Sequence, residues 1–310
     1  MGTHPNGPSV LAGQPTVYLK DIIKSNPEVL TSEIAKIYGD LPFLFKVLSV
    51  NKALSIQAHP DKVLGKKLFE KFPNLYKDPN HKPEMAVAIT RFEALCGFRP
   101  LEEILSFLSK YPEFRELVGS DISSHFIQTV TGKEDSNVHE NILSNKTALR
   151  QLFAAVMTAD ADIVTFQVKK LISRLESSDI LVGSVQELLI RLNEQFPGDV
   201  GIFCVLMLNH VILEPSQAIF LGANEPHAYL SGASDNVIRA GLTPKFKDVA
   251  VLLDMLTYRY GNAESQILTP IPYNNSKSSL LYDPPIEEFS VLLATLNPQN
   301  KKEAYEDQSA

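Results

Sequence analysis

The feature that most constrains the fold is a change in the spacing of apolar residues near Pro100 and again near Phe196. Between these positions the apolar residues recur at helical spacing, and Pro100 followed by acidic residues is a helix-start signal. One such stripe contains Leu149, Leu152, Phe153, Val156 and Met157, and another contains Leu188, Leu189 and Leu192. On either side, short apolar runs are typical of strands. The pattern predicts a mixed, mainly β architecture with an all-helical block inserted, and it excludes the regular alternation of a doubly wound sheet.

The segments outside this block give individual expectations. Short helices are expected over 16–27, from Glu28 to near Gly39, and over 62–72 before Pro73. Strands are expected within 41–50, 52–60, 81–89, 201–213 and 218–230. The polar stretch from Asn297 onward is expected to be a solvated tail.

Composition bounds the class of protein. The 310 residues include 44% hydrophobic residues and two cysteines, Cys96 and Cys204, which fits a globular protein of a reducing cytoplasm. The sequence has no apolar stretch long enough to cross a bilayer and no secretion signal at its start, so no membrane partner is expected. A net charge of −7 argues against a general nucleic-acid binder. An anionic small molecule remains possible, since a few cationic residues in one pocket suffice.

Polar side chains share strand faces in two of the predicted strands. In LSIQAH, residues Ser55, Gln57 and His59 point to one side, because side chains alternate across a strand. In HKPEMAVAI, Lys82 and Glu84 share a face with small alanines. A solvated sheet would also alternate in this way, but it usually favours long charged residues over alanines. The small residues therefore favour a cavity.

A third element, NEPHAYL, places His227 and Tyr229 on one face. A glutamine oxygen, a carboxylate and two imidazoles could form a Zn²⁺ site with an open position. For His59 or His227 taken alone, a hydrogen-bonded structural histidine is the alternative. Spacing does not show whether the three segments meet.

Consecutive blocks along the chain resemble one family. LPFLFKVLSV, LSIQAHPDK, NHKPEMAVAIT, LCGFRP, PHAYL and SDNVIRAGLTPKFKDV, in this order over residues 41–255, are similar to type I mannose-6-phosphate isomerases. That family has a zinc-containing cupin (jelly-roll) barrel with an inserted helical domain, and it interconverts mannose 6-phosphate and fructose 6-phosphate. The resemblance implies one Zn²⁺ per chain, held by Gln57, His59, Glu84 and His227.

The resemblance also implies roles for other residues. Arg239, in SDNVIRAGLTPK, falls on the family's active-site arginine and would stabilise the enediolate electrostatically, with a surface ion pair as the alternative. The remaining substrate-binding candidates are Ser55, Lys82, Lys46, Tyr229, Asp235 and Lys245. The substrate partner is a small sugar phosphate, and the expected state is a cytoplasmic monomer that supplies mannose 6-phosphate for GDP-mannose synthesis.

Four segments are expected from the layout and the resemblance together. They are 1–99 as the first part of the catalytic barrel, 100–196 as the helical insertion, 197–285 as the second part of the barrel, and 286–310 as a truncated strand and polar tail. The resemblance implies that a second, C-terminal barrel is incomplete. Compared with the family, the chain looks truncated at both ends, and HAYLSGASDN lacks an acid/base glutamate that a longer loop carries. Losing such a group costs roughly 10²–10⁴ in rate.

Two other functions compete with the isomerase. A catalytically impaired sugar-phosphate-binding cupin, or an incomplete isoform, is favoured by the absent loop glutamate. An iron oxygenase is chemically compatible with the ligand types, but it leaves the SDNVIRAGLTPK block unexplained. Metal analysis separates the oxygenase from the zinc alternatives.

Overall fold

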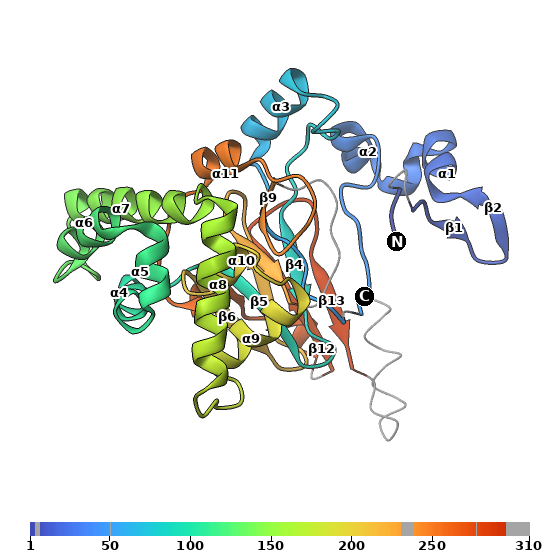
Figure 1. Cartoon of the computed structure of the whole chain (residues 1–310). Helices are drawn as coiled ribbons and strands as arrows, with labels where there is room; N and C mark the ends of the chain where they lie inside the picture. Colours follow the sequence, from blue (N-terminus) through green and yellow to red (C-terminus); the bar gives the residue numbers. More distant parts are fainter. Residues whose placement is uncertain (4–6, 50, 231–237, 277, 296–310) are drawn as a thin grey trace. The chain divides into compact units, whose positions relative to one another are not determined.

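The structure is a computed structural model that describes residues 1–3, 7–49, 51–230, 238–276 and 278–295 (Figure 1). The chain forms two compact units. One contains residues 1–48 and 268–310, and the other contains residues 49–267. The candidate metal ligands all lie in the second unit.

A five-stranded antiparallel sheet forms the centre of the unit 49–267. Its strand order is β6-β5-β8-β3-β9. The strands are β6 (Leu208–Leu213), β5 (Phe92–Phe98), β8 (His227–Tyr229), β3 (Ile56–Ala58) and β9 (Ile238–Gly241). Strands from before the helical block therefore pair with strands from after it. This pairing brings residues 170 positions apart in sequence, such as Gln57 and His227, into one row.

A second sheet lies in the order β10-β7-β4. Its strands are β10 (Ile267–Leu268), β7 (Ala218–Leu221) and β4 (Glu84–Val87). Side chains of both sheets form one apolar cluster, with Ile219 and Leu221 from β7 and Ala94, Cys96 and Tyr229 from the five-stranded sheet. The two sheets thus enclose a small shared core, as the halves of a barrel do.

The small residues of 81–89 fill that core. Ala88 is buried within the cluster, and Ala86 packs against it. The expectation that these alanines leave room for a ligand is therefore wrong at this level of the barrel, because apolar side chains pack against them.

Helices cover the opposite face of the five-stranded sheet. They are α4 (Leu101–Lys110), α5 (Pro112–Val118), α6 (Ser120–Val130), α7 (His139–Met157), α8 (Ala161–Glu176) and α9 (Val185–Gln195), gathered on one side of β5 and β6 (Figure 1). Ile56, Leu95 and Ala228 project from the sheet into the large core that these helices build. Asp160 caps the start of α8, and Ser184 caps the start of α9. The side-chain oxygen of each residue accepts hydrogen bonds from backbone N–H groups in the first turn of the helix.

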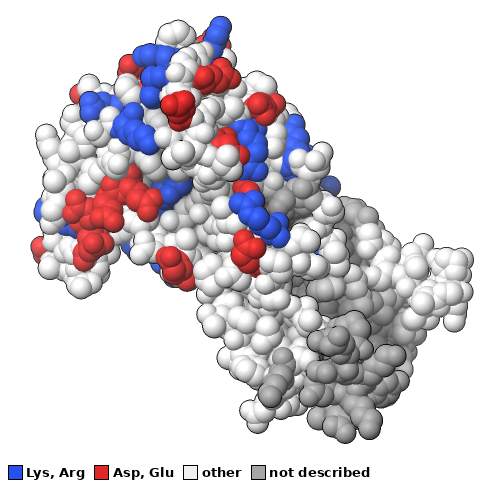
Figure 2. Space-filling view, turned by 90° about the horizontal axis from the view of Figure 1, so that it is seen from below, with Lys and Arg blue, Asp and Glu red and all other residues white. Residues whose placement is uncertain are grey.

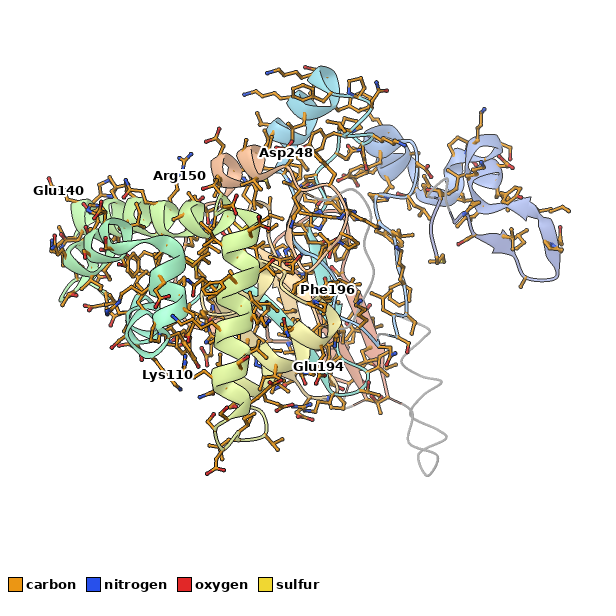
Figure 3. All side chains as sticks on the ribbon, in the orientation of Figure 1. Lys110, Glu140, Arg150, Glu194, Phe196 and Asp248 are labelled. Atoms are coloured by element: carbon orange, nitrogen blue, oxygen red, sulfur yellow. The ribbon has the colours of Figure 1, made fainter. Side chains whose placement is uncertain are left out.

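Two further helices flank the strand ends. Helix α3 (Lys62–Lys71) is capped by Asp61, whose carboxylate accepts from the N–H of Leu64 at 2.8 Å. Helix α11 (Val249–Met255) is capped in the same way by Asp248, and its Asp254 forms an ion pair with Arg150 of α7. Figure 3 labels Arg150 and Asp248.

The unit 1–48 with 268–310 contains short elements. They are β1 (Val10–Leu11), β2 (Gln14–Tyr18), α1 (Leu19–Ser25), a 3₁₀ turn (Pro27–Leu30), α2 (Ser32–Tyr38), β11 (Ile271–Pro272), a 3₁₀ turn (Tyr273–Asn275), β12 (Ser279–Tyr282) and β13 (Val291–Ala294). Helix α2 ends at Gly39, whose φ of 68° is the left-handed value that favours glycine. A further 3₁₀ turn, Ala263–Gln266, belongs to the other unit.

Most of the expected elements are confirmed, and two expectations are wrong. The helical block spans 101–195, and its two apolar stripes are buried. Residues 41–49 form no strand, and 44–49 are exposed. Residues 201–204 form a helix, α10 (Gly201–Cys204), instead of the start of a strand. Both errors arose from continuous apolar runs, which periodicity alone cannot assign to one type of structure.

The domain boundaries at residues 99, 196 and 285 stay predictions. Within the described residues, no helix is both long and apolar enough to cross a membrane.

Candidate metal centre

Three strands bring the predicted ligands together. Gln57 of β3 lies directly opposite His227 of β8 in the antiparallel ladder, so their side chains share a face of the sheet. His59 follows β3 immediately, and Glu84 begins β4 in the facing sheet. The alternation expected from the sequence is confirmed, since Ile56 and Ala58 point into the helical core instead.

The donor atoms of these residues lie within a few ångströms of one another. The Nε2 atom of His59 is 3.1 Å from Oε1 of Glu84, and Nε2 of His227 is 3.9 Å from Oε2. Ligand atoms of the two histidines and the glutamate all lie within 4.8 Å of one another. Gln57 completes the group, with its amide nitrogen 3.5 Å from Nε2 of His227.

His227 is held in the form that a metal requires. Its side chain is fully buried, and Nδ1 lies 3.0 Å from the carbonyl oxygen of Glu225. A proton on Nδ1 donates to that carbonyl and leaves the Nε2 lone pair facing Glu84. Burial and the neighbouring His59 lower the pKa of His227 to about 4. The imidazole is therefore neutral near pH 7.

Glu84 is held as a carboxylate. Burial raises the pKa of its carboxyl group, but the hydrogen bond and charge of His59, with a contribution from Lys82, lower it further. The net pKa lies well below the usual range. The Tyr229 hydroxyl donates to Oε2 of Glu84 at 2.9 Å, and burial beside Glu84 raises the pKa of this phenol, so it stays a donor.

Gln57 is held by Ser55. The Ser55 hydroxyl lies 3.2 Å from Oε1 of Gln57 and donates a hydrogen bond to it. A half-turn of the amide exchanges oxygen and nitrogen, and a hydroxyl can serve either as a donor or as an acceptor. Ser55 can therefore orient the amide whichever atom faces the histidines.

Arg239 lies next to this group. It is opposite Gln57 on the other side of β3, so β8, β3 and β9 place His227, Gln57 and Arg239 in one row on one face. Arg239 is partly buried and lines a small cavity with Tyr76 and Asp248. The structure thus brings the predicted active-site arginine beside the predicted ligands.

The other candidates divide into two groups. Lys82 joins the site, with Nζ 3.9 Å from Oε1 of Glu84. Lys245 is exposed in the segment that follows β9, and Lys46 is exposed in the other unit. Asp235 lies outside the described residues.

The donor set suits Zn²⁺. Imidazole nitrogens and carboxylate oxygens bind this ion at roughly 2.0–2.2 Å, which in a tetrahedron separates them by about 3.3–3.6 Å. The separations between imidazole Nε2 and a Glu84 carboxylate oxygen, 3.1 Å for His59 and 3.9 Å for His227, lie on either side of that range. The neutral imidazole of His227, the ionised carboxylate of Glu84 and the Gln57 amide need no proton removed near pH 7. A proton on Nε2 of His59 that bonds to Glu84 must leave before this nitrogen binds a metal.

Sequence reasoning missed the residues that support these ligands. The turn Asn224-Glu225, just before the proline that precedes His227, supplies the acceptor for Nδ1. A signal was present, because Asn in a turn commonly adopts a positive φ, and Asn224 has a φ of 63°. The partners of this turn, however, are distant in sequence and only the fold shows them.

Family models match two parts of the chain. The model described as phosphomannose isomerase type I, catalytic domain, matches residues 1–101, and the model for the helical insertion domain of the same enzyme matches residues 117–208.

Similar proteins agree with these matches. A mannose-6-phosphate isomerase of Candida glabrata is 48% identical over 99% of this chain and 75% of its own length, and one of Saccharomyces cerevisiae is 47% identical over 96% and 73%. A crystal structure of mannose 6-phosphate isomerase from Salmonella typhimurium, bound to fructose 6-phosphate and zinc, has a TM-score of 0.80 at 33% identity. The match covers 96% of this chain and 74% of that one.

Proposed function

Because this chain belongs to the type I phosphomannose isomerase family, we propose that Gln57, His59, Glu84 and His227 hold the Zn²⁺ with which it interconverts mannose 6-phosphate and fructose 6-phosphate. The activity and the zinc requirement follow from the relatives. The ligand set is carried by one observation, the convergence of donor atoms of His59, Glu84 and His227 within 4.8 Å.

The reaction moves a proton between neighbouring sugar carbons. In the forward direction the proton leaves C2 of the aldose, an enediol forms, and a proton is added at C1 to give the ketose. When bound, Zn²⁺ supplies a Lewis acid for the substrate oxygens. The protein must supply charge stabilisation, proton transfer and a hold on the phosphate.

Arg239 is proposed to stabilise the negative charge that develops on the sugar oxygens. Its backbone pairs with that of Gln57, so the permanent cation is carried by the strand next to a proposed ligand, and a guanidinium offers several N–H donors in a fixed plane. Removing one such donor costs about 10²–10³ in kcat. Lys82, next to Glu84, is proposed to bind a substrate oxygen or the phosphate. A substrate role for Lys46, Asp235 and Lys245 stays a prediction from the resemblance.

Ser55 and Tyr229 are proposed to act mainly through the ligands. Ser55 orients the Gln57 amide and Tyr229 donates to Glu84, so both hydroxyls are engaged inside the site. Sugar contacts by the same hydroxyls stay predictions.

The cellular setting is also a proposal. We propose a cytoplasmic location, which is supported by two buried, free cysteines, and a monomeric state, which stays a prediction. Independence from nucleic acids is supported by the net charge of −7. In Figure 2, Lys and Arg side chains stand among Asp and Glu, and the described residues on this face form no continuous basic area.

The test is isomerase activity of the purified 310-residue chain, measured in both directions with and without a chelator. We expect turnover that a chelator removes and added Zn²⁺ restores. Arg239→Ala should lower kcat about 10²–10³-fold while the zinc content stays unchanged. A folded, zinc-loaded chain without turnover would instead support the sugar-phosphate binder.

A further inference from the structure

The turn between β7 and β8 has more polar contacts than a connecting turn requires. Asn224 has a φ of 63°, and its backbone N–H, backbone carbonyl, side-chain oxygen and side-chain nitrogen all form hydrogen bonds. Asparagine adopts this conformation more readily than most residues, and glycine, the other common choice, brings no side chain. Asparagine is therefore suited both to the positive φ and to the side-chain hydrogen bonds at this position.

On one side, Asn224 binds the segment that carries His59. Its N–H donates to the carbonyl of His59 at 2.8 Å. Its Oδ1 accepts from the N–H of Asp61 at 3.2 Å, and its Nδ2 donates to Oδ2 of Asp61 at 2.9 Å. Asp61 also caps helix α3, so the whole corner after His59 is fixed.

On the other side, the same turn fixes His227. The carbonyl of Glu225 accepts from Nδ1 of His227 at 3.0 Å. The next layer is Thr257, whose N–H donates to the carbonyl of Asn224 at 3.2 Å and whose hydroxyl donates to the Glu225 carboxylate at 2.6 Å. Both faces of the turn are therefore bonded to neighbouring structure.

We propose that Asn224 is a positioning residue that sets the two metal-binding histidines relative to each other through its pair of side-chain bonds with Asp61; this rests on the ligand set proposed above. Strands β3 and β8 pair at a single position, Gln57 with His227, so the ladder does not reach His59. Beyond the ladder, the two segments are joined by the backbone bond from Asn224 to His59, and the side-chain bonds between Asn224 and Asp61 fix the geometry of that connection. Groups that orient metal ligands typically contribute 10–100-fold to metal affinity.

Exchanging donor and acceptor tests the contact. Asn224→Asp places a carboxylate against the Asp61 carboxylate, and Asp61→Asn places two amide NH₂ groups against each other. The double variant restores one donor and one acceptor, and its residue 61 retains an oxygen to cap α3. Asn224→Gly keeps the positive φ while it removes both side-chain bonds.

The readout is Zn²⁺ affinity of the metal-free chain, measured by competition with a chromogenic chelator, and the visible spectrum of the Co²⁺-loaded chain. Each single variant and Asn224→Gly should bind Zn²⁺ about 10–100-fold more weakly, with altered Co²⁺ bands. The double variant should return to within about threefold of the wild type. Thermal melting of the metal-free chains identifies any variant that fails to fold.

Two results would overturn the proposal. One is unchanged Zn²⁺ affinity in folded single variants or in folded Asn224→Gly. The other is a folded double variant that stays as weak as the singles. A wild-type chain that binds no Zn²⁺ would instead contradict the ligand set, so the two failures are distinguishable.

Discussion

The helical block α4–α9 and the metal centre are held together in different ways. The block buries whole stripes of large apolar side chains, including Leu149, Leu152 and Phe153, and each contributes through removal of apolar surface from water. The metal centre consists of a few buried polar groups, and each must have a partner because an unpaired buried group is costly. Apolar packing tolerates neighbours of similar size, whereas the site depends on particular atoms at particular distances. Substitutions in the two regions should therefore change different quantities.

The largest effect is expected from removing a ligand. His227→Ala should abolish stoichiometric Zn²⁺ binding and reduce isomerase activity to background. Changing a group that only supports a ligand typically weakens metal affinity ~10–100-fold, and removing the ligand itself should weaken it more. Metal content after dialysis and a coupled assay measure this. The matched control is His125→Ala, which removes an exposed histidine of α6 and should change neither quantity. Retained zinc in His227→Ala would contradict the ligand set.

The next effect concerns stability alone. Phe153 is fully buried on α7 and packs edge-to-face on Phe98 of β5, with ring centroids 5.2 Å apart. Phe153→Ala should lower the free energy of unfolding by about 3–5 kcal/mol. Urea denaturation measures this, with Phe153→Leu as the milder control. The Zn²⁺ affinity of the folded variant should stay within about threefold of the wild type, since it keeps every ligand contact. A larger change would show that the two regions are not separable.

A smaller effect on stability is expected at the contact between the five-stranded sheet and helix α9. Glu93 of β5 binds Arg191 of α9 and His210 of β6, and its bond to His210 and its pairing with Arg191 lower the pKa of this carboxyl to about 2. Because the pKa of Glu93 is lower in the folded state than in the unfolded state, its ionised carboxylate stabilises the fold at pH values above the unfolded-state pKa. This contribution is lost as the pH falls toward 2. Glu93→Gln should cost about 1–2 kcal/mol at pH 7, because partial exposure screens the pairs.

Denaturation of both proteins between pH 7 and pH 2 checks this prediction. The difference between Glu93→Gln and the wild type should shrink as the pH falls below about 4.5. A difference that stays constant over this range would show that the Glu93 charge does not couple the sheet to α9.

The smallest effect is expected at Tyr229. Tyr229→Phe keeps the ring and removes the bond from the hydroxyl to Glu84. We expect about tenfold weaker Zn²⁺ binding. Stability should fall by about 1 kcal/mol, the net contribution of one hydrogen bond. Isothermal titration of the metal-free variant measures the first quantity and thermal melting the second. Intact affinity with a raised KM would instead indicate a sugar contact.

The same contrast explains what the sequence could predict. Helical periodicity is a local signal repeated over many residues, so the block from Leu101 to Gln195 was predictable. The faces of β3 and β4 were also predictable, because strand alternation places Gln57 beside His59 and Glu84 beside the alanines. Non-local pairing has no comparable local signal. The row of His227, Gln57 and Arg239 followed only from the register of three strands.

The support of the site was less predictable still. Glu225 acts on His227 through its backbone carbonyl, which any residue type carries. The Asn224–Asp61 contact joins residues 163 positions apart. Strand β5, the neighbour of β8, was not recognised from the sequence.

The most direct test of the ligand set is a crystal structure of the zinc-loaded chain with anomalous data collected above and below the zinc edge. We predict one strong peak per chain, bound by the imidazole Nε2 atoms of His59 and His227, a Glu84 carboxylate oxygen and the Gln57 amide oxygen. A single peak bound by other residues, or a fully loaded chain in which these four side chains remain bonded only to one another, would contradict it.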